Sequence, residues 1–286
     1  MFNLQQEFLG QCPSIGKAMP LNTLVKTPKG WTRLGDLIIG DLVIGPLGNH
    51  SPIVGITPQG ITENFKFVFE DGRTADSHPL HLWEVSETPI TEDGSISRAG
   101  YVTTTQDIMN HFDQFSYHIP LVQEVHGMMR LPDDASNIIG LASTLLTSGI
   151  PIDHTVMELS YSERYGIAKS MLEQSGCHVC DRGVAFLCEQ EMAGRNFQRL
   201  LWSIGGIATL CPYGSLYRIC FKHRDVVGLV DSLMGSSLAE ILDLEQYTDL
   251  KLKIVGIQQQ KAIETLCITI DSDDNLYIVD DWVVTR

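Results

Sequence analysis

The sequence of 286 residues has little positive charge, because 20 Lys and Arg stand against 35 Asp and Glu and leave a formal net charge of -15. A protein that binds nucleic acid over its whole surface needs a basic face for the phosphates, so this composition argues against one. No apolar run reaches the roughly 18–20 residues that span a bilayer. The first residues, MFNLQQEFLGQ, lack both the basic start and the apolar stretch of a signal peptide. We therefore expect a cytoplasmic protein that does not enter a membrane.

An export signal is lacking too, and the chain has seven cysteines, an odd number that cannot all pair with one another. An odd number in this context predicts reduced thiols. The group Cys177, His178, Cys180 and Cys188 contains a single Cys-x-x-Cys without a second pair, which favours ordinary buried thiols over a zinc site. We therefore predict no metal and no cofactor. With 43% hydrophobic and 19% charged residues, the chain has the composition of one or two folded domains.

A β pattern runs from Ala18 to about Val85. LVKTPKGWTRLGDL alternates as strand, turn and strand, and Asp71-Gly72 in FKFVFEDGRTAD suits the tight turn of a hairpin. Residues 86–125 are mixed and predict loops with a short helix near 105–115. The β pattern returns after Leu250 in KLKIVGI, LCITID and LYIVDDWVVTR, with a turn expected at 273–275.

Between these parts the pattern becomes helical. Helices are predicted at 137–148, at 162–175 with Ser162 as the cap, in GRNFQRLLWSIG and at 224–233, with strands in VAFLCEQ and SLYRICFK. This is an α+β module of ordinary domain size. The simplest account is one β domain, residues 18–130 and 251–286, interrupted by an inserted α+β domain, residues 131–250.

The first 17 residues have a different character. QCPSIGK ends in Gly16-Lys17, the tail of a phosphate-binding loop, where backbone N–H groups and a lysine hold phosphates. Ala18 stands where such a loop has its Mg²⁺-binding Ser or Thr, and the residue five before Gly16 is Gln11 instead of Gly. The segment 1–17 is interpreted as a remnant of a nucleotide-binding loop. QQEFLGQCPSIGK resembles the start of a phage terminase or a replicative-helicase motor, so one alternative is a fragment of a P-loop ATPase.

Three segments in order resemble an intein, a self-splicing domain of the Hint fold. They are NTLVKTPKGWTRLGDLIIGDLV, EDGRTADSHPLHLWEV and TLCITIDSDDNLYIVDDWVVTR. The resemblance implies a mainly β, horseshoe-like domain, preceded by residues 1–17 as the N-terminal extein. It also implies that the chain acts on its own flanking extein, as a monomer, in the cytosol of a bacterium or phage host.

An intein normally begins with Cys or Ser, whereas this one would begin with Ala18, which has no nucleophile. A minority class uses an internal cysteine together with a tryptophan and a threonine, and Cys267, Trp83 and Thr285 stand at the matching places. The resemblance implies that the Cys267 thiolate attacks the Lys17 carbonyl directly. The block histidine is then His81, which would protonate the leaving amide of Ala18, while Trp83 and Thr285 shape the pocket of the nucleophile. A second alignment instead makes His78 the block histidine.

Each of these residues also has an ordinary structural interpretation. A cysteine in a strand is more often a small buried hydrophobe, and Trp83 and Thr285 suit a β core. At the end of the chain, Arg286 stands where inteins usually have histidine, and no Asn follows. The resemblance therefore predicts cleavage at Lys17–Ala18 without complete splicing.

The middle domain resembles a homing endonuclease of the LAGLIDADG (DOD) type. LASTLLTSG, residues 141–149, and AKSMLEQSG, residues 168–176, match the two nonapeptides, but Ser148 and Ser175 replace the aspartates that hold Mg²⁺ in active members. Residues 131–250 carry 8 Lys and Arg against 15 Asp and Glu, the opposite of what gripping DNA requires. We therefore expect a degenerate insert that does not bind DNA, and that would need Mg²⁺ only if it were active. A working site-specific endonuclease is the remaining alternative.

Overall fold

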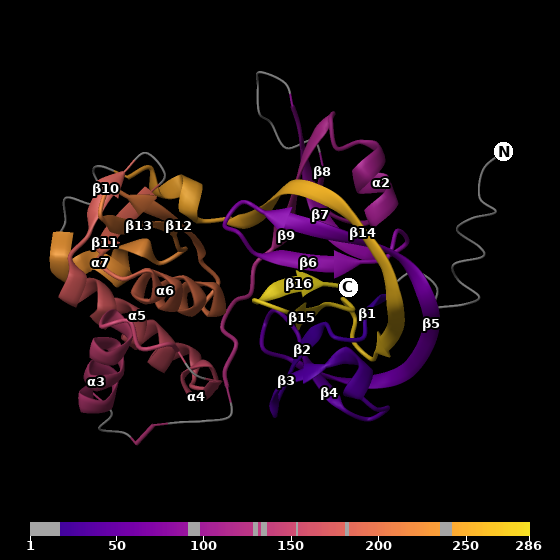
Figure 1. Cartoon of the computed structure of the whole chain (residues 1–286), viewed down its shortest axis with the longest axis horizontal. Helices are drawn as coiled ribbons and strands as arrows, with labels where there is room; N and C mark the ends of the chain where they lie inside the picture. Colours follow the sequence, from indigo (N-terminus) through magenta and orange to yellow (C-terminus); the bar gives the residue numbers. More distant parts are fainter. Residues whose placement is uncertain are drawn as a thin grey trace. The chain divides into compact units, whose positions relative to one another are not determined.

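A computed structural model describes residues 18–90, 98–127, 131–132, 136–152, 154–180, 183–234 and 242–286 (Figure 1). The chain forms two compact units. Unit 1 comprises Met1–Pro120 with Leu252–Arg286, and unit 2 comprises Leu121–Lys251. Residue 120, where the last strand of the first β segment ends, replaces the predicted boundary at residue 130. Lys17 and Gly16, and with them the remnant loop, lie outside the described residues.

The described part of unit 1 is made of strands with one short α-helix and the 3-10 helix Leu34–Asp36. Its elements are β1 (Met19–Pro20), β2 (Leu24–Thr27), β3 (Gly30–Arg33), β4 (Leu42–Ile44), β5 (His50–Phe69), β6 (Thr74–Ser77), β7 (Leu82–Pro89), β8 (Arg98–Thr104), α2 (Thr105–Asn110), β9 (Phe115–Pro120), β14 (Lys251–Ile270), β15 (Tyr277–Val279) and β16 (Val283–Thr285). Within the described residues, one sheet has the order β4-β5-β14-β9-β7-β8, with β1 paired to β14 and β6 to β5. The order β16-β15-β2-β3 forms a second sheet.

The two longest strands, β5 and β14, form the frame of unit 1. They run antiparallel along one another and curve together (Figure 1). Four irregularities interrupt their register, and such bulges bend and twist a strand. The alternation predicted from FKFVF is present, because Phe65, Phe67 and Phe69 are buried while Lys66 and Val68 between them are less so. The pairing of β5 with β14 therefore places the C-terminal segment of unit 1 beside its N-terminal segment.

Several expectations for unit 1 need correction. Residues 86–120 were expected to be loops with a short helix, but they contain the second half of β7 and the strands β8 and β9, because polar side chains and Gly100 conceal the alternation. The predicted hairpin is present, but its turn spans four residues and not two, since β5 ends at Phe69 and β6 begins at Thr74. The buried Asp71 carboxylate accepts hydrogen bonds from the Arg73 backbone and guanidinium, which holds this wider turn.

Unit 2 is an α+β unit in which helices pack on a sheet. Its elements are α3 (Ser136–Thr147), α4 (His154–Met157), α5 (Tyr161–Ser175), β10 (His178–Cys180), β11 (Gly183–Cys188), α6 (Glu191–Ser203), β12 (Ile207–Tyr213), β13 (Leu216–Lys222) and α7 (Val226–Met234). Its sheet has the order β10-β11-β13-β12 within the described residues. The core includes Phe197 of α6, whose ring meets Phe186 and Phe221 edge-on at 4.7 and 5.2 Å.

The N-terminus of α5 corrects the expected cap. Ser160, not Ser162, is the cap residue: its hydroxyl accepts the Glu163 backbone N–H, and the Glu163 carboxylate accepts the Ser160 N–H in return. This reciprocal pair is a capping box, readable in the sequence as Ser-x-x-Glu. None of the helices in the described part of the chain is both long and apolar enough to cross a membrane.

The hairpin formed by β15 and β16 contains a half-buried carboxyl group, that of Asp280. Asp280 lies in its turn at a φ of 30°, and its Oδ1 accepts the Leu24 N–H at 2.9 Å. Burial raises the pKa of Asp280 from 3.8 to about 6, more than the Leu24 N–H lowers it. The folded chain thus holds this proton more tightly than the unfolded chain. The resulting stabilisation is fully present below about pH 4 and is lost as the pH rises through about 6.

Replacing Asp280 by asparagine is therefore expected to stabilise unit 1 at neutral pH. Asn keeps the oxygen that binds Leu24 and tolerates a positive φ, but it removes a desolvated charge. We expect a gain of about 2–3 kcal/mol at pH 7.5 that vanishes near pH 4, at about 1.4 kcal/mol per pKa unit. Urea unfolding at the two pH values measures it. An equal gain at both would contradict the assignment to Asp280 ionisation.

Candidate active site

Ala18 lies directly before β1 in unit 1. Met19 pairs with Leu266 and Pro20 with Thr265 in an antiparallel register. Continued by one residue, this register sets Ala18 opposite Cys267. The Ala18 carbonyl accepts the backbone N–H of His78 at 3.0 Å, so the residue is held from two sides. Ala18 and Cys267 are both buried, with 2% and 0% of their surfaces exposed.

His81 and Thr285 meet inside the same unit. The His81 Nε2 and the Thr285 Oγ1 lie 2.5 Å apart, and both side chains are buried. The backbone of His81 is fixed on both sides, because its N–H donates to the His78 carbonyl and its carbonyl accepts the Thr105 N–H, each at 2.9 Å. The imidazole therefore has a defined orientation beside the end of β16.

Trp83 is fully buried two residues further along. Its ring lies edge-on to His81 at 5.1 Å and tilted against Phe67 at 4.8 Å. The indole Nε1 donates to the Thr105 hydroxyl at 3.0 Å, and that hydroxyl also lies 3.0 Å from the Ser77 Oγ. Trp83 thus packs against the histidine and is fastened to the first turn of α2.

His78 is placed differently from His81. It is half-buried, and its Nδ1 accepts the Leu80 N–H at 3.1 Å. Burial lowers the pKa of His78, partly offset by Glu63. The backbone N–H of His78 binds the Ala18 carbonyl, whereas the ring of His81 contacts Thr285 and Trp83.

Sequence reasoning missed two hydroxyl residues in this cluster, Thr105 and Tyr277. Thr105 joins Trp83 to Ser77, but a threonine at a helix start is ordinary and gives no signal. Tyr277 is the Cα partner of Thr285 across the β15–β16 hairpin, and its hydroxyl donates to the Met19 sulfur at 3.8 Å. The turn predicted at 273–275 is present between β14 and β15, but a second turn at 280–282 divides LYIVDDWVVTR into a hairpin and so pairs Tyr277 with Thr285.

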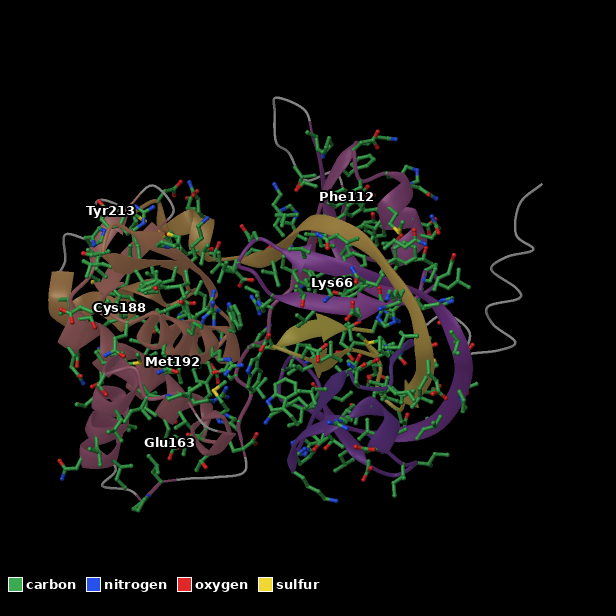
Figure 2. The ribbon with its side chains drawn as sticks, in the orientation of Figure 1. Lys66, Phe112, Glu163, Cys188, Met192 and Tyr213 are labelled. Carbon is green, nitrogen blue, oxygen red and sulfur yellow. The ribbon has the colours of Figure 1, made fainter. Side chains whose placement is uncertain are left out.

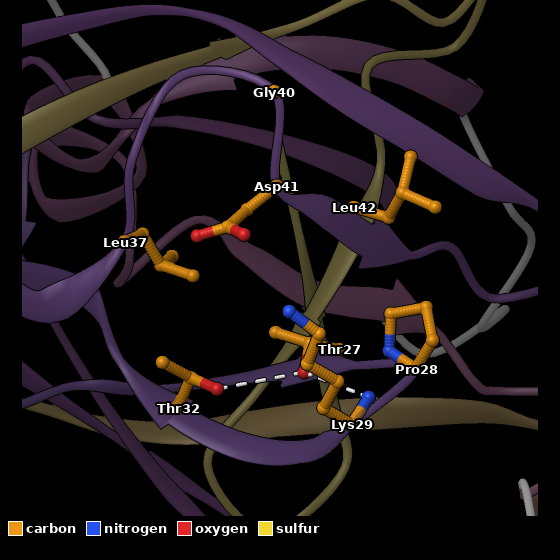
Figure 3. A pocket seen from close by; sticks show the side chains of 8 residues that line it. All are labelled: Thr27, Pro28, Lys29, Thr32, Leu37, Gly40, Asp41 and Leu42. Atoms are coloured by element: carbon orange, nitrogen blue, oxygen red, sulfur yellow. Dashed lines mark hydrogen bonds between the residues drawn. The ribbon is translucent and has the colours of Figure 1, made fainter.

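Unit 1 also has a hollow of about 300 Å³ (Figure 3). It is lined by Thr27, Pro28, Lys29, Thr32, Leu37, Gly40, Asp41 and Leu42. Its polar groups bind one another, since the Thr27 hydroxyl accepts the Lys29 N–H, donates to the Gly30 carbonyl and lies 3.4 Å from the Thr32 hydroxyl. None of these residues belongs to the cluster around His81.

In unit 2, α3 and α5 carry the two nonapeptide-like segments and pack together. The hydroxyls at their third positions, Ser143 and Ser170, lie 2.9 Å apart. Ser148 is exposed and donates to the Leu145 carbonyl, and Ser175 is half-buried at the last position of α5. The helix pair thus presents hydroxyls at the two positions where the resemblance expects carboxylates.

The cysteines of unit 2 lie in and near its sheet. The sulfurs of Cys180 and Cys220 lie 3.7 Å apart, and burial raises the pKa of Cys220 to about 11. Cys188, labelled in Figure 2, is buried and donates to the Gln190 carbonyl. The described residues hold no cluster of three or more His, Cys, Asp or Glu side chains arranged for a metal ion.

Comparison with known proteins gives short or distant similarities. No protein-family model matches the chain. The replicative DNA helicase DnaB of Mycobacterium intracellulare is 30% identical over 90 residues, which are 31% of this chain and only 16% of that relative's length. Among solved structures, a substituted gp41-1 intein is 12% identical with a TM-score of 0.37, over 95% of this chain and 99% of that one. The Msm DnaB1 intein splicing domain bound with zinc is 13% identical with a TM-score of 0.37, over 94% and 98%.

Proposed function

We propose that unit 1 is an autoprocessing domain of the intein type, in which the Cys267 thiolate attacks the peptide bond between Lys17 and Ala18. The observation that carries this proposal is the register of β1 against β14, which sets Ala18 opposite Cys267. Residues directly opposite in an antiparallel pair have Cα atoms about 4.5–5.5 Å apart. The bond on the N-terminal side of Ala18 therefore begins within reach of the thiol.

The reaction we propose is an acyl transfer. The Cys267 sulfur adds to the Lys17 carbonyl carbon, and the bond from that carbon to the Ala18 nitrogen breaks. His81 gives a proton to the departing nitrogen, so the products are a thioester of residues 1–17 on Cys267 and a free amine on Ala18. Water or an added thiol then cleaves the thioester and restores the Cys267 thiol.

The neighbours of His81 support its role as the acid. A proton donor must be held close to the leaving group, and the Thr285 hydroxyl and the Trp83 ring fix the imidazole in place. The same segment fixes the leaving group, because the His78 N–H binds the Ala18 carbonyl. The alternative alignment that makes His78 the block histidine is less favoured, since its imidazole accepts the Leu80 N–H and lies outside the His81–Thr285 contact.

Mass spectrometry of the purified full chain tests the proposal. Incubation with dithiothreitol at neutral pH is expected to release residues 1–17 and leave a product that begins at Ala18. Hydroxylamine should release the same peptide as a hydroxamate, because it also attacks thioesters. An intact mass after prolonged incubation with either reagent would refute autoprocessing at this bond.

We further propose that unit 2 is a degenerate LAGLIDADG-type insert that does not cleave DNA. Ser148 and Ser175 offer hydroxyls where Mg²⁺ prefers charged oxygens. Residues 131–250 also carry seven more acidic than basic side chains, which repel a duplex. Supercoiled plasmid carrying the helicase or terminase sequence without the insertion should stay uncut in Mg²⁺. Linear product that disappears with EDTA would favour a working endonuclease instead.

A further inference from the structure

Thr105 is a fully buried residue that binds three residues of the segment 77–83, although it takes no part in the proposed acyl transfer. Its N–H donates to the His81 carbonyl at 2.9 Å. Its hydroxyl oxygen accepts the Trp83 Nε1–H at 3.0 Å and lies 3.0 Å from the Ser77 Oγ. Thr105 therefore holds the backbone of the proposed acid and also the side chain that packs against the acid's ring.

Gln106 extends this contact to Pro79, whose carbonyl accepts the Gln106 N–H at 2.8 Å. Two consecutive residues thereby bind every second residue from 77 to 83. Between the first two of these, His78 donates its N–H to the Ala18 carbonyl at 3.0 Å. The segment that binds Ala18 and carries the proposed acid is thus held by hydrogen bonds along its length.

The hydroxyl of Thr105 supplies an acceptor that Trp83 needs. An indole N–H can only donate, and Trp83 has no exposed surface, so its N–H cannot turn to water if that acceptor is removed. A buried N–H without an acceptor is costly, which favours a shifted ring. The Trp83 ring lies edge-on to His81 at 5.1 Å. A shift of the indole therefore changes the surface against which the imidazole packs.

We propose that Thr105 is a positioning residue, which acts through Trp83 and the His81 carbonyl to direct the imidazole toward the departing Ala18 nitrogen. This inference rests on the function proposed for unit 1. Proton transfer requires the acid to be aligned within hydrogen-bond reach, and a small misplacement lowers a rate strongly.

The proposed role has a kinetic signature. The imidazole that gives the nitrogen its proton in the forward direction removes that proton in reverse. Its alignment therefore changes the forward and reverse rates of thioester formation by the same factor and leaves the equilibrium between peptide and thioester unchanged. Subsequent attack of an added thiol on the thioester does not involve the departing nitrogen, so Thr105 has no effect on that step.

The test is the rate at which the full chain releases residues 1–17 at neutral pH, measured against dithiothreitol concentration. At low thiol the thioester forms and reverts many times before capture, so the rate depends on the equilibrium. At saturating thiol the rate equals that of thioester formation. For Thr105→Val, which keeps the shape but removes the hydroxyl, we expect a rate about tenfold lower at saturating thiol and a wild-type rate at low thiol. Thr105→Ser restores the acceptor and should restore the saturating rate.

A second substitution removes the same hydrogen bond from its other side. Replacing Trp83 by 3-benzothienylalanine puts sulfur in place of the indole N–H and leaves Thr105 intact. It should reproduce the curve of Thr105→Val, and the two changes together should lower the rate no further than either alone. Thr104→Val is the matched control, because the Thr104 hydroxyl caps the same helix by accepting the Asp107 N–H at 3.0 Å. It should keep the wild-type curve.

A merely structural role for Thr105 would lower the rate by one factor at every thiol concentration. This result would overturn the inference, as would an unchanged curve, a failed rescue by serine or an equal loss in Thr104→Val. Failure of the two proposals is distinguishable. A wild-type chain that releases nothing removes both, whereas wild-type release with a curve that does not depend on the Thr105 hydroxyl removes the Thr105 inference only.

Discussion

Replacing Cys267 by alanine is expected to abolish the thiol-induced release of residues 1–17. In the proposed reaction no other group forms the thioester, and Ala18 has no side chain that could act first. Removal of a covalent nucleophile commonly lowers a rate by a factor of about 10⁴ or more. Mass spectrometry after incubation with dithiothreitol should show the intact Cys267→Ala chain while the wild-type chain is processed.

Two further variants distinguish the chemistry from folding. Cys267→Ser keeps the size of the side chain but replaces a thiol by a much less acidic hydroxyl, so release should again be lost. Cys220→Ala alters a buried cysteine of unit 2 and should leave release unchanged. The nucleophile assignment would be wrong if the Cys267→Ala chain still lost residues 1–17 at the wild-type rate.

Local patterns in the sequence predicted the elements that depend on neighbouring residues. The strand–turn–strand at 24–33 follows from alternation around Pro28-Lys29-Gly30, and α3 follows from its apolar spacing. The strands within residues 86–120 were not predicted because polar residues occupy many of their outward positions. The cap of α5 was misplaced by two residues because Ser162 also suits a cap, and only Glu163 decides for Ser160.

The site was harder to predict because its residues come together through long-range pairing. Cys267, Trp83 and Thr285 were proposed as site residues through a resemblance, and alternation gives no hint that the β1–β14 register, continued by one residue, sets Ala18 opposite Cys267. That proximity depends on β1 pairing with β14, across most of the chain. Tyr277 was missed for a simpler reason. The turn expected at 273–275 is present between β14 and β15, with Asn275 at positive φ. A second turn, which was not expected, lies between β15 and β16 at 280–282, with Asp280 and Trp282 at positive φ.

Replacing Arg73 by methionine is expected to destabilise unit 1 by about 3–5 kcal/mol. The Arg73 guanidinium binds the Asp71 carboxylate with an N–O distance of 2.9 Å, and both side chains have no exposed surface. Its Nη1 also donates to the Trp282 carbonyl at 3.3 Å. Methionine keeps much of the volume but leaves the buried Asp71 charge without its guanidinium, which is the costly part of the change.

Guanidinium chloride unfolding followed by tryptophan fluorescence measures this loss, since Trp31, Trp83 and Trp282 all belong to unit 1. Arg195→Met is the matched control, because the Arg195–Glu191 pair is exposed and should cost less than about 1 kcal/mol. The double variant Asp71→Leu/Arg73→Met removes both charges and should recover part of the stability. Because Trp282 precedes the strand that carries Thr285, the Arg73→Met chain should also release residues 1–17 more slowly under conditions where it remains folded. Wild-type stability together with wild-type release would mean that neither the ion pair nor the Trp282 contact holds this end of the chain in place.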